Sequence, residues 1–234
     1  MKFSFSCQAC PRLSAFLADV RQVHPDYHAR PVAPYGDTNP KLLIVGLAPG
    51  MHGANRTGRP FTGDHAGILL YQTLHKFGYA TASLSVHTDD GLKLNGCRIT
   101  NAVKCLPPQN KPELSEIRQC NGYLKSELNA LAAGAAILAL GTVAHYSVLL
   151  AMNLRKSEFP FTHGARHELP SKLALYDSYH CSRYNTQTKR LTEAMFVQVF
   201  STIAEHSNGT NAGAGLAPDI ESGKSRSRSR AHQY

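Results

Sequence analysis

The sequence has no run of about 18 apolar residues, the length that a membrane-spanning helix requires. Its N-terminal stretch MKFSFSCQACPR also lacks the apolar core and cleavage site of a secretory signal peptide. We therefore expect a cytoplasmic protein without a membrane partner. In that reducing compartment its six cysteines are poor disulfide candidates and better ligands for a metal or a cluster.

Acidic residues are scarce as well. The chain has 16 Asp and Glu against 25 Lys and Arg, which gives a formal net charge of +9 and a pI near 9.3. Such an excess suits a polyanionic partner, because each phosphate that a basic residue neutralises releases a counterion. The basic residues near the C-terminus supply only part of the excess, so the charge favours a nucleic-acid partner for the rest of the chain too.

A chain of 234 residues can bury one sizeable core. We predict one domain over residues 1–206 and a disordered tail over residues 207–234, where Gly, Ser and Arg replace the apolar periodicity. Strand-like apolar runs lie at residues 41–46, 98–103, 135–140 and 172–179, and helical periodicity lies at residues 66–77, 112–131, 142–152 and 191–204. Their alternation predicts an α/β fold, a three-layer α/β/α sandwich with a central, mainly parallel four-stranded sheet.

The chain is organised around residues 41–64, KLLIVGLAPGMHGANRTGRPFTGD, where the first apolar strand runs into a glycine-rich loop. In open α/β folds such a loop lies at the carboxyl edge of the sheet, where ligands bind. Neither G-x-G-x-x-G nor G-x-x-x-x-G-K-[ST] occurs in it, so we expect no nucleotide cofactor. A connector without a ligand is the alternative, but polar and aromatic residues interleave with the glycines and favour a binding loop.

Three motifs occur in the order GLAPGMHGANRTGRPFTGD, ITNAVKCLPP and YHCSRYNTQTKRLT. Together they resemble the motifs of the uracil-DNA glycosylase superfamily, specifically its iron–sulfur branch, called family 5 or type b. The resemblance runs from Cys7 to the closing helix. It implies a monofunctional uracil-DNA glycosylase that hydrolyses the N-glycosidic bond in uracil-containing DNA during base-excision repair, and that often removes other deaminated or modified bases.

The resemblance also implies a pocket for an extruded base. Phe61 would stack on the uracil, and the side-chain amide of Asn101 would donate to one edge of the base and accept from the other. His180, at the end of the fourth strand, would donate a hydrogen bond to a carbonyl oxygen of the base. Gly46 and Ala48 would contribute their backbone to the same pocket. The alternatives are a core phenylalanine, an asparagine that only makes a turn and an ordinary histidine.

The group that activates water is less obvious, because the Gly46-Leu47-Ala48-Pro49 turn contains no acid or base. Asp64 is the nearest carboxylate that the resemblance leaves available, and Asn55 would help to position the water. Asp64 is equally well explained as the N-cap of the helix that follows it. Electrostatic stabilisation with an unactivated water is a further alternative.

The segment from Ser182 to Asn185 is expected to contact DNA. By the resemblance, Ser182, Arg183, Tyr184 and Asn185 would enter the minor groove and fill the space that the extruded base leaves. An exposed polar loop without a partner is the alternative. The family usually has proline after the histidine, whereas this chain has Cys181, which frees φ and restores an N–H group. We therefore expect a less rigid loop.

Four cysteines form a candidate ligand set. Cys7 and Cys10 make a C-x-x-C pair, and Cys105 and Cys120 flank a proline-rich loop. Four thiolates suit either a structural zinc or a [4Fe–4S] cluster, and their spacing does not choose between the two. The resemblance implies the [4Fe–4S] cluster, in a structural role, with zinc as the alternative. The other two cysteines are expected to be ordinary buried residues.

A different class of function stays open at this point. A nucleic-acid-binding iron–sulfur protein with little or no glycosylase activity would also fit the motifs, because Leu47, Ala48 and Cys181 depart from a complete catalytic set. A small α/β protein that binds another ligand in the glycine-rich loop is a third possibility. In each case we expect a monomer.

Overall fold

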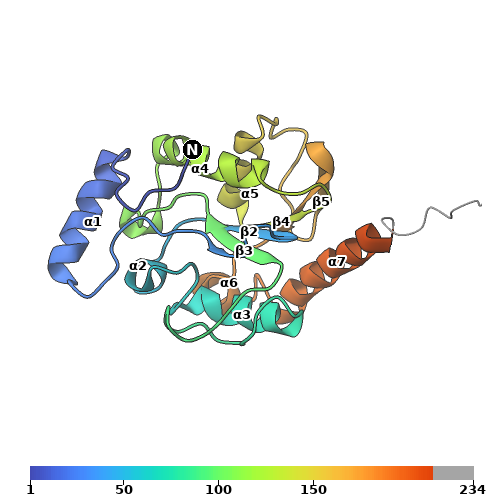
Figure 1. Ribbon diagram of the computed structural model, residues 1–234, viewed down its shortest axis with the longest axis horizontal. Helices are drawn as coiled ribbons and strands as arrows, with labels where there is room; N and C mark the ends of the chain where they lie inside the picture. Colours follow the sequence, from blue (N-terminus) through green and yellow to red (C-terminus); the bar gives the residue numbers. More distant parts are fainter. Residues whose placement is uncertain (213–234) are drawn as a thin grey trace, which may run out of the picture.

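The computed structural model describes residues 1–212, in which a six-stranded sheet lies between two layers of helices (Figure 1). The strands are β1 (Tyr35–Gly36), β2 (Leu42–Gly46), β3 (Cys97–Asn101), β4 (Ala136–Leu140), β5 (Arg166–Leu169) and β6 (Leu173–Ser178). The helices are α1 (Pro11–Val23), α2 (Ala54–Thr57), α3 (His65–Lys76), α4 (Leu114–Asn129), α5 (Thr142–Ala151), α6 (Arg183–Gln187) and α7 (Glu193–Ala212), with short 3-10 turns η1 (Pro108–Asn110) and η2 (Pro170–Lys172).

The centre of the sheet is parallel. Strands β3, β2, β4 and β6 lie side by side in that order, and Leu42 of β2 lies opposite Cys97 of β3 and Ala136 of β4. Every residue of β2, β4 and β6 is buried, as expected of strands that are covered on both faces. The predicted parallel core is confirmed, and its four strands are those that the apolar runs indicated.

The predicted number of four strands is corrected to six. Strand β1 pairs antiparallel with β3 at one edge, and β5 pairs antiparallel with β6 at the other. Strand β1 is two residues long and lies in a proline-rich connector, while β5 reads RHEL and exposes Arg166 and Glu168. Neither segment has an apolar run, because an edge strand is not buried on both faces. Its shortness or its charged side chains also discourage pairing with another chain.

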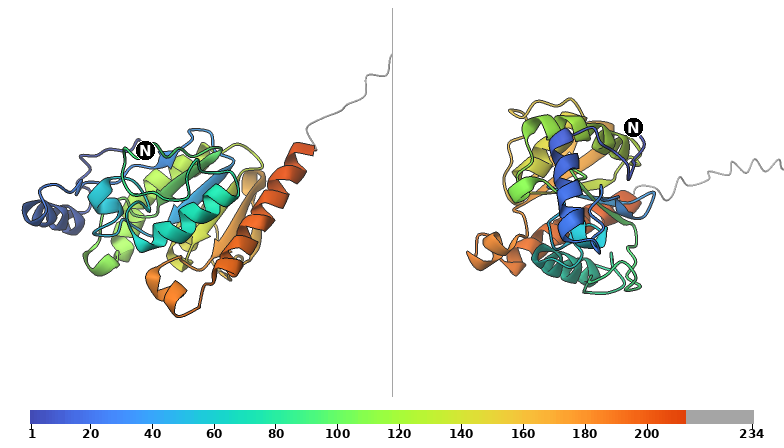
Figure 2. Two further views of the ribbon diagram at one scale, coloured as in Figure 1. Left: turned by 90° about the horizontal axis from the view of Figure 1, so that it is seen from below. Right: turned by 90° about the vertical axis from the view of Figure 1, so that its left-hand side faces the viewer.

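The two faces of the sheet carry separate cores, which makes the sandwich. Leu42 and Ile44 point to the side that α3 and α7 cover, whereas Leu43 and Val45 point to the side that α4 and α5 cover. Figures 1 and 2 show these two helical layers on opposite faces of the sheet. The alternation follows from the period of two along a strand, which sends successive side chains to opposite faces.

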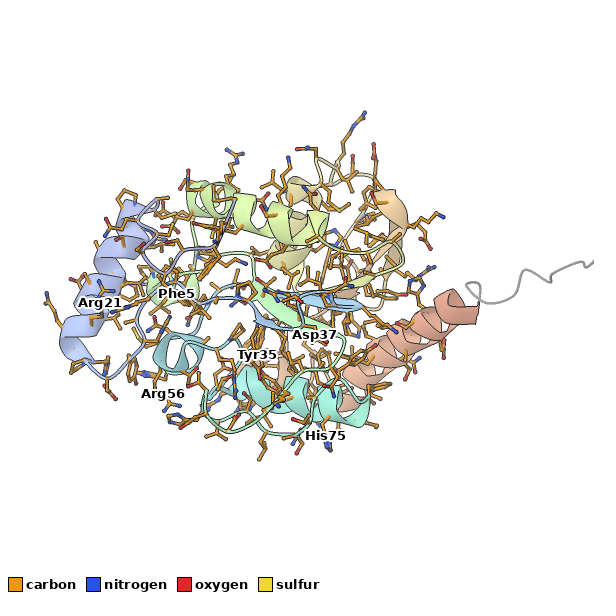
Figure 3. The ribbon with its side chains drawn as sticks, in the orientation of Figure 1. Phe5, Arg21, Tyr35, Asp37, Arg56 and His75 are labelled. Atoms are coloured by element: carbon orange, nitrogen blue, oxygen red, sulfur yellow. The ribbon has the colours of Figure 1, made fainter. Side chains whose placement is uncertain are left out.

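Helix α1 stands at one end of the sandwich (Figure 2), where it packs against the segments that follow β2 and β3. Arg21 points from it toward the connector that follows and donates to the carbonyl of Ala29 at 2.6 Å (Figure 3). At the other end of α1, Arg12 makes two hydrogen bonds with the buried carboxylate of Glu116 in α4, at 2.8 and 2.7 Å. These contacts bring Cys10, the N-cap residue of α1, against α4.

The closing helix α7 continues to Ala212, past the domain boundary that the sequence predicted at residue 206. The rest of the predicted tail, residues 213–234, lies outside the described residues. Within residues 1–212, no helix combines the length and the apolar composition that crossing a membrane requires.

Candidate active site

A cleft of about 600 Å³ opens where the parallel strands end. It is lined by the loops that follow β2, β3, β4 and β6, because parallel strands deliver their carboxyl ends to one edge of the sheet. The predicted site residues that line it are Ala48, Phe61, Asp64, Asn101, His180, Ser182, Arg183 and Asn185. Gly46 packs under two of them, whereas Asn55 is fully buried and Tyr184 is exposed; neither is a lining residue.

Gly46, the last residue of β2, allows two other residues to meet. A Cβ atom at this position would lie 2.7 Å from the ring of Phe61 and closer still to Oδ1 of Asn101. Any side chain would therefore displace both residues, so glycine is required by the space itself. The predicted contribution of Gly46 to a base pocket stays a prediction, but its contact with Phe61 and Asn101 explains the residue type.

Phe61 adopts an unusual backbone conformation. Its φ of +54° lies in the left-handed region that a bulky residue rarely occupies. Its carbonyl oxygen approaches Gly67 so closely that a Cβ there would overlap it. The ring is stacked with that of His180, with 5.9 Å between the centroids and 28° between the planes. The strained backbone thus directs the ring into the cleft, where the rest of the structure must hold it.

Asn101 ends β3 with its side chain 3% exposed and its Oδ1 atom without a hydrogen-bond partner in the described part of the chain. The next two residues continue the pairing with β2, because Ala102 N–H donates to Gly46 O at 2.9 Å and Val103 N–H to Leu47 O at 3.0 Å. A buried amide oxygen without a partner costs about 1–3 kcal/mol. A ligand that donates a hydrogen bond to Asn101 would recover that cost.

His180 follows β6 and forms another wall of the cleft. Burial lowers the pKa of His180 to about 4, so its imidazole is neutral near pH 7 and offers one N–H donor. Asn185 Nδ2 donates to the His180 carbonyl at 2.8 Å, and Gly141 packs beneath the His180 side chain. These contacts fix the residue on a short connection between β6 and α6.

Asp64 carries out the structural role that was weighed as an alternative. Its Oδ1 atom accepts from the Gly67 N–H at 2.8 Å and caps α3. Burial raises the pKa of Asp64, against the opposing effect of the backbone N–H groups of Gly67 and Ala66. Its Oδ2 atom lies against Gly53, where a Cβ would be 2.5 Å away. One oxygen is thus committed to the helix, while the residue still lines the cleft; the catalytic role stays a prediction.

Asn55 lies in the first turn of α2, behind the cleft-lining loop. Its backbone is fixed by hydrogen bonds of its N–H with Gly50 O and of its C=O with Ala29 N, both at 3.0 Å. Its side chain is fully buried, and neither Oδ1 nor Nδ2 has a partner among the described residues. A buried amide with both ends free is suited to holding a water molecule.

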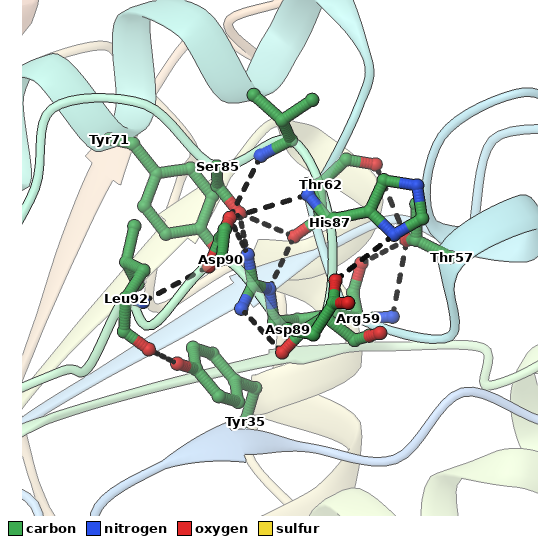
Figure 4. Close-up of polar contacts among 12 residues, drawn as sticks. Tyr35, Thr57, Arg59, Thr62, Tyr71, Ser85, His87, Asp89, Asp90 and Leu92 are labelled. Carbon is green, nitrogen blue, oxygen red and sulfur yellow. Dashed lines mark hydrogen bonds and ion pairs between the residues drawn. The ribbon is translucent and has the colours of Figure 1, made fainter.

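A buried network holds both neighbours of Phe61 (Figure 4). Arg59 forms an ion pair with Asp90 and donates to Ser85 Oγ at 2.7 Å and to Thr62 Oγ1 at 2.8 Å. The Tyr71 hydroxyl donates to the carbonyl of Pro60 at 3.0 Å. The chain is therefore fixed immediately before and after Phe61, which explains how its left-handed backbone persists.

The electrostatics of this network favour the ion pair. Partial burial pushes the pKa of Asp90 upward, but the hydrogen bonds from Arg59 and from the N–H groups of Leu92, Val86 and His87 outweigh it. The pKa of Asp90 is therefore held well below its usual range. The guanidinium of Arg59 also lies 5.0 Å from the centroid of the Tyr35 ring, which shields it from water. Neither Arg59 nor Asp90 was among the site residues predicted from the sequence.

Other lining residues were not predicted. Tyr179 stacks on His163 with 4.9 Å between the ring centroids, and the guanidinium of Arg190 lies 4.8 Å from the centroid of the Tyr179 ring. Phe161 and Asn110 also line the cleft. Arg190 lies within the third sequence motif, so the motif could have indicated it. Phe161 and Asn110 lie in irregular segments without periodicity, which gave no indication of them.

The segment after Cys181 begins a helix, so the loop expected there is corrected to the short helix α6. Ser182 caps it by accepting from the Asn185 N–H at 3.4 Å, which a free loop would not need. Arg183 and Tyr184 project from its first turn, and Tyr184 is 69% exposed. The mouth of the cleft therefore presents a large aromatic ring to the solvent.

Four cysteines from three parts of the fold face a second cavity of about 120 Å³. They are Cys7, Cys10, Cys105 and Cys120. Burial, followed by the charges of the neighbouring cysteines, raises the pKa of Cys105 to about 12. Ala48, which lines the cleft, packs in the same apolar cluster as these cysteines. The two cavities therefore lie on either side of one loop.

The spacing of the sulfur atoms bears on what they can hold. A tetrahedral zinc with Zn–S bonds of about 2.3 Å places its sulfurs about 3.8 Å apart. In residues 1–212, the ligand atoms that gather in threes within 4.8 Å of one another belong to His145, His167 and Asp177, not to the cysteines. The cysteines thus form no such group of three in the described residues, and whether they hold zinc or a [4Fe–4S] cluster stays a prediction.

The chain was compared with known proteins. Residues 33–204 match the family model described as the Uracil DNA glycosylase superfamily. Similar proteins include the Type-5 uracil-DNA glycosylase of Thermus thermophilus, with 46% identity over 83% of this chain and 90% of that protein. Those of Mycobacterium leprae and Pyrobaculum aerophilum are 42% and 37% identical, over 83% and 85% of this chain and 88% of each relative.

The Arg59 network predicts a stability effect. Arg59→Met should lower the free energy of unfolding by about 3 kcal/mol, because it leaves the carboxylate of Asp90 without its cation. Arg155→Met is the control, since it breaks an exposed ion pair with Glu158 and should leave the unfolding midpoint nearly unchanged. Urea unfolding followed by circular dichroism measures both. Equal midpoints for the two variants would contradict the proposed importance of the network.

The low pKa of His180 predicts a pH dependence of stability. Between about pH 6.5 and 4 the unfolded chain protonates this histidine and the folded protein does not, so the unfolded state binds more protons. The free energy of unfolding should therefore fall as the pH is lowered through this window, and His180→Asn should remove that part of the slope. An NMR titration of the imidazole with a midpoint above 6.5 would disprove this assignment.

Proposed function

The chain belongs to the uracil-DNA glycosylase superfamily, and from this premise we propose that it excises uracil from DNA by hydrolysing the N-glycosidic bond. It leaves an abasic site, without cutting the strand, for the later steps of base-excision repair. The observation that carries the proposal is the meeting of Phe61, Asn101 and His180 in one cleft. An extruded nucleotide needs such a pocket, with an aromatic ring to stack on and polar groups that match the base edge.

In this proposal Phe61 and Asn101 recognise the base. The ring of Phe61 stacks on the planar pyrimidine, and the amide of Asn101 accepts from the base N–H while donating to the neighbouring carbonyl. The unpartnered and buried Oδ1 of Asn101 supports this assignment, because a base N–H supplies the hydrogen bond that the protein does not. Gly46 and Ala48 form the adjoining wall with their backbone.

His180 stabilises the charge that develops as the bond breaks. The bonding electron pair leaves with the base, so negative charge gathers on its carbonyl oxygen and positive charge on the sugar. A fixed N–H donor at that oxygen lowers the barrier without having to reorganise. The low pKa of His180 supports a neutral donor, which binds the anionic base without giving up its proton.

Asp64 and Asn55 are our candidates for handling the water. The water adds to the anomeric carbon, and the proton that it loses ends on the departing base anion. Asp64 lines the cleft and has one oxygen outside the helix cap, while Asn55 has both ends of its amide free. Asp64 would attract the sugar cation and orient the water, with Asn55 as a positioning residue.

The first turn of α6 is our candidate for the DNA contact. Ser182, Arg183, Tyr184 and Asn185 would enter the minor groove and occupy the space that the base vacates. The exposure of Tyr184 at the mouth of the cleft supports this, because a wedge must present a large side chain before DNA binds. Cys181 is buried beneath the turn, which gives that position a packing role in place of the family's usual proline.

We propose that Cys7, Cys10, Cys105 and Cys120 hold a [4Fe–4S] cluster with a structural role. Four thiols around one cavity support a thiolate-bound group at this site, and the resemblance to the iron–sulfur branch of the family favours the cluster over zinc. Bound there, the group would cross-link the N-terminal segment, the loop after β3 and helix α4.

The remaining properties follow from the substrate. We propose a monomer that needs no nucleotide cofactor and acts in the cytoplasm, associated with the nucleoid, where DNA lies. The net charge of +9 supports the polyanionic partner. The proposed substrates include other deaminated or modified bases, since small residues, Ala48 and Gly50, line the cleft and leave room for a substituent.

The assigned role of His180 gives a kinetic prediction. His180→Ala should slow single-turnover excision from a uracil-containing duplex by more than about 100-fold, because it removes the donor to the departing base. The matched control is His75→Ala, which changes an exposed histidine that points away from the fold at the end of α3 (Figure 3). Alkali treatment of the oligonucleotide reveals the abasic product. An unchanged rate in His180→Ala would remove this role.

The same assay tests the function itself. If stoichiometric protein binds the duplex and yields no alkali-sensitive product, the chain is a nucleic-acid-binding protein and the excision proposal fails.

The metal content tests the cluster. Anaerobically purified protein should contain iron and inorganic sulfide and show broad brown absorbance, and Cys105→Ser should lose both. Cys97→Ala is the control, because Cys97 is buried in β3, away from the cysteine cavity, and should keep its iron. Stoichiometric zinc without iron would overturn the assignment.

A further inference from the structure

Lys104 is buried between the cysteine cavity and the end of β3. It is 1% exposed and lies one residue before Cys105 and three after Asn101. A lysine is almost never buried to this extent unless its charge is paired and its donors are used. Here the ammonium donates to Thr100 Oγ1, to the backbone carbonyl of Asn101 at 2.9 Å and to Glu127 Oε1 at 2.7 Å. All three of its donors are therefore occupied.

Two of these three bonds act on the end of β3. The peptide group after Asn101 is held on its N–H side by Gly46 and on its carbonyl side by the ammonium of Lys104. The side chain of the preceding residue, Thr100, is bound by the same ammonium. The direction of the Asn101 side chain follows from this backbone, because no side-chain partner holds its Oδ1 atom in the described part of the protein.

The anchor for Lys104 is helix α4. Cys120 and Glu127 are seven residues apart, about two helical turns, and therefore share one face of the helix. Cys120 Sγ accepts from the Lys104 N–H at 3.3 Å, and Glu127 pairs with its ammonium. Helix α4 thus binds both the backbone N–H and the side-chain ammonium of Lys104.

The ion pair is not explained by stability alone. Replacing a buried ion pair by apolar residues of similar volume is often neutral or stabilising, because the charges must be taken out of water. The Oε2 atom of Glu127 is buried without a hydrogen-bond partner among the described residues, which adds to that cost. The ion pair costs energy to bury, and its ammonium also donates to the carbonyl of Asn101. This combination indicates that the pair is kept to fix the position of the Asn101 backbone.

We propose that Lys104 is a positioning residue, anchored by Glu127 and α4, that fixes Asn101 for reading the base. This inference rests on the proposed excision of uracil. It adds a route by which the helix that carries Cys120 controls base recognition, since α4 holds the lysine and the lysine holds the peptide of Asn101.

The test is the double variant Lys104→Met/Glu127→Leu, which keeps the apolar volume and leaves no unpaired charge. It should fold with a thermal midpoint near that of the wild type and should excise uracil roughly 10- to 100-fold more slowly, because a small misplacement of a recognition group is costly. In an Asn101→Ala background the double variant should cause no further loss of rate, since the group it positions is already absent. An equal further loss in that background would overturn the proposal.

Binding provides a readout that does not depend on turnover. The probe is a duplex with 2′-fluorinated deoxyuridine, whose glycosidic bond resists hydrolysis, measured against the same duplex with thymidine. The double variant should lose most of the preference for the uracil duplex and bind the thymidine duplex as the wild type does. An unchanged preference would overturn the proposal. Glu127→Gln keeps an oxygen that accepts from Lys104 and should retain the preference for the uracil duplex. This variant replaces the double variant in the binding test if the double variant does not fold, and a loss of the preference would then overturn the proposal.

The control is Arg12→Met/Glu116→Leu, which removes another ion pair of α4. That pair ties α4 to α1 beside Cys10 and does not contact Asn101. It should leave the preference for uracil intact. A loss equal to that of the Lys104 variant would overturn the inference, because any loosening of α4 would then be enough. If the wild type itself neither excises nor prefers uracil, the proposed function fails; if only the Lys104 variants match the wild type, this inference fails alone.

Discussion

The close approach of Phe61 and Asn101 over Gly46 is the constraint on which the site depends. Two parallel strands end side by side, and the absence of a side chain at Gly46 lets an aromatic ring from one loop meet an amide from the next strand. This arrangement does not stabilise itself, because Phe61 has a strained backbone and the Oδ1 atom of Asn101 has no hydrogen-bond partner among the described residues. The surrounding protein must hold both.

Two buried cations supply that support from different directions. Arg59 ties the chain on both sides of Phe61 to the loop that carries Ser85 and Asp90, whereas Lys104 ties the peptide of Asn101 to α4. Each cation uses most of its donors within the protein, so neither is free to bind phosphate. The basic character of the chain is thus divided between exposed residues that suit DNA and buried ones that shape the pocket.

The central sheet and the edge where the cleft opens could be predicted from sequence for a physical reason, whereas the roles of the individual site residues came from the resemblance and stay predictions. Strands that are buried on both faces leave continuous apolar runs, and the residues at or just after the ends of parallel strands lie at one edge of the sheet. Asn101, which ends β3, and His180, two residues after β6, therefore line the same cleft. The edge strands β1 and β5 bury little and leave no such run. Asp90 could not be found either, since its contact with Arg59 joins an irregular loop to a distant residue.

The chemistry that this pocket favours follows from the protonation states and the free hydrogen-bonding atoms of its side chains. Asp64 has committed one oxygen to the cap of α3, and although burial raises its pKa, the N–H groups that bind it oppose the rise and a carboxylate remains a weak base. His180 is neutral because the same burial removes the water that would stabilise its charge. A reaction that needed strong proton abstraction would be poorly served here. A reaction whose bond breaks ahead of water attack needs instead a fixed donor for the leaving anion and a nearby carboxylate for the cation, and the cleft places one group of each kind.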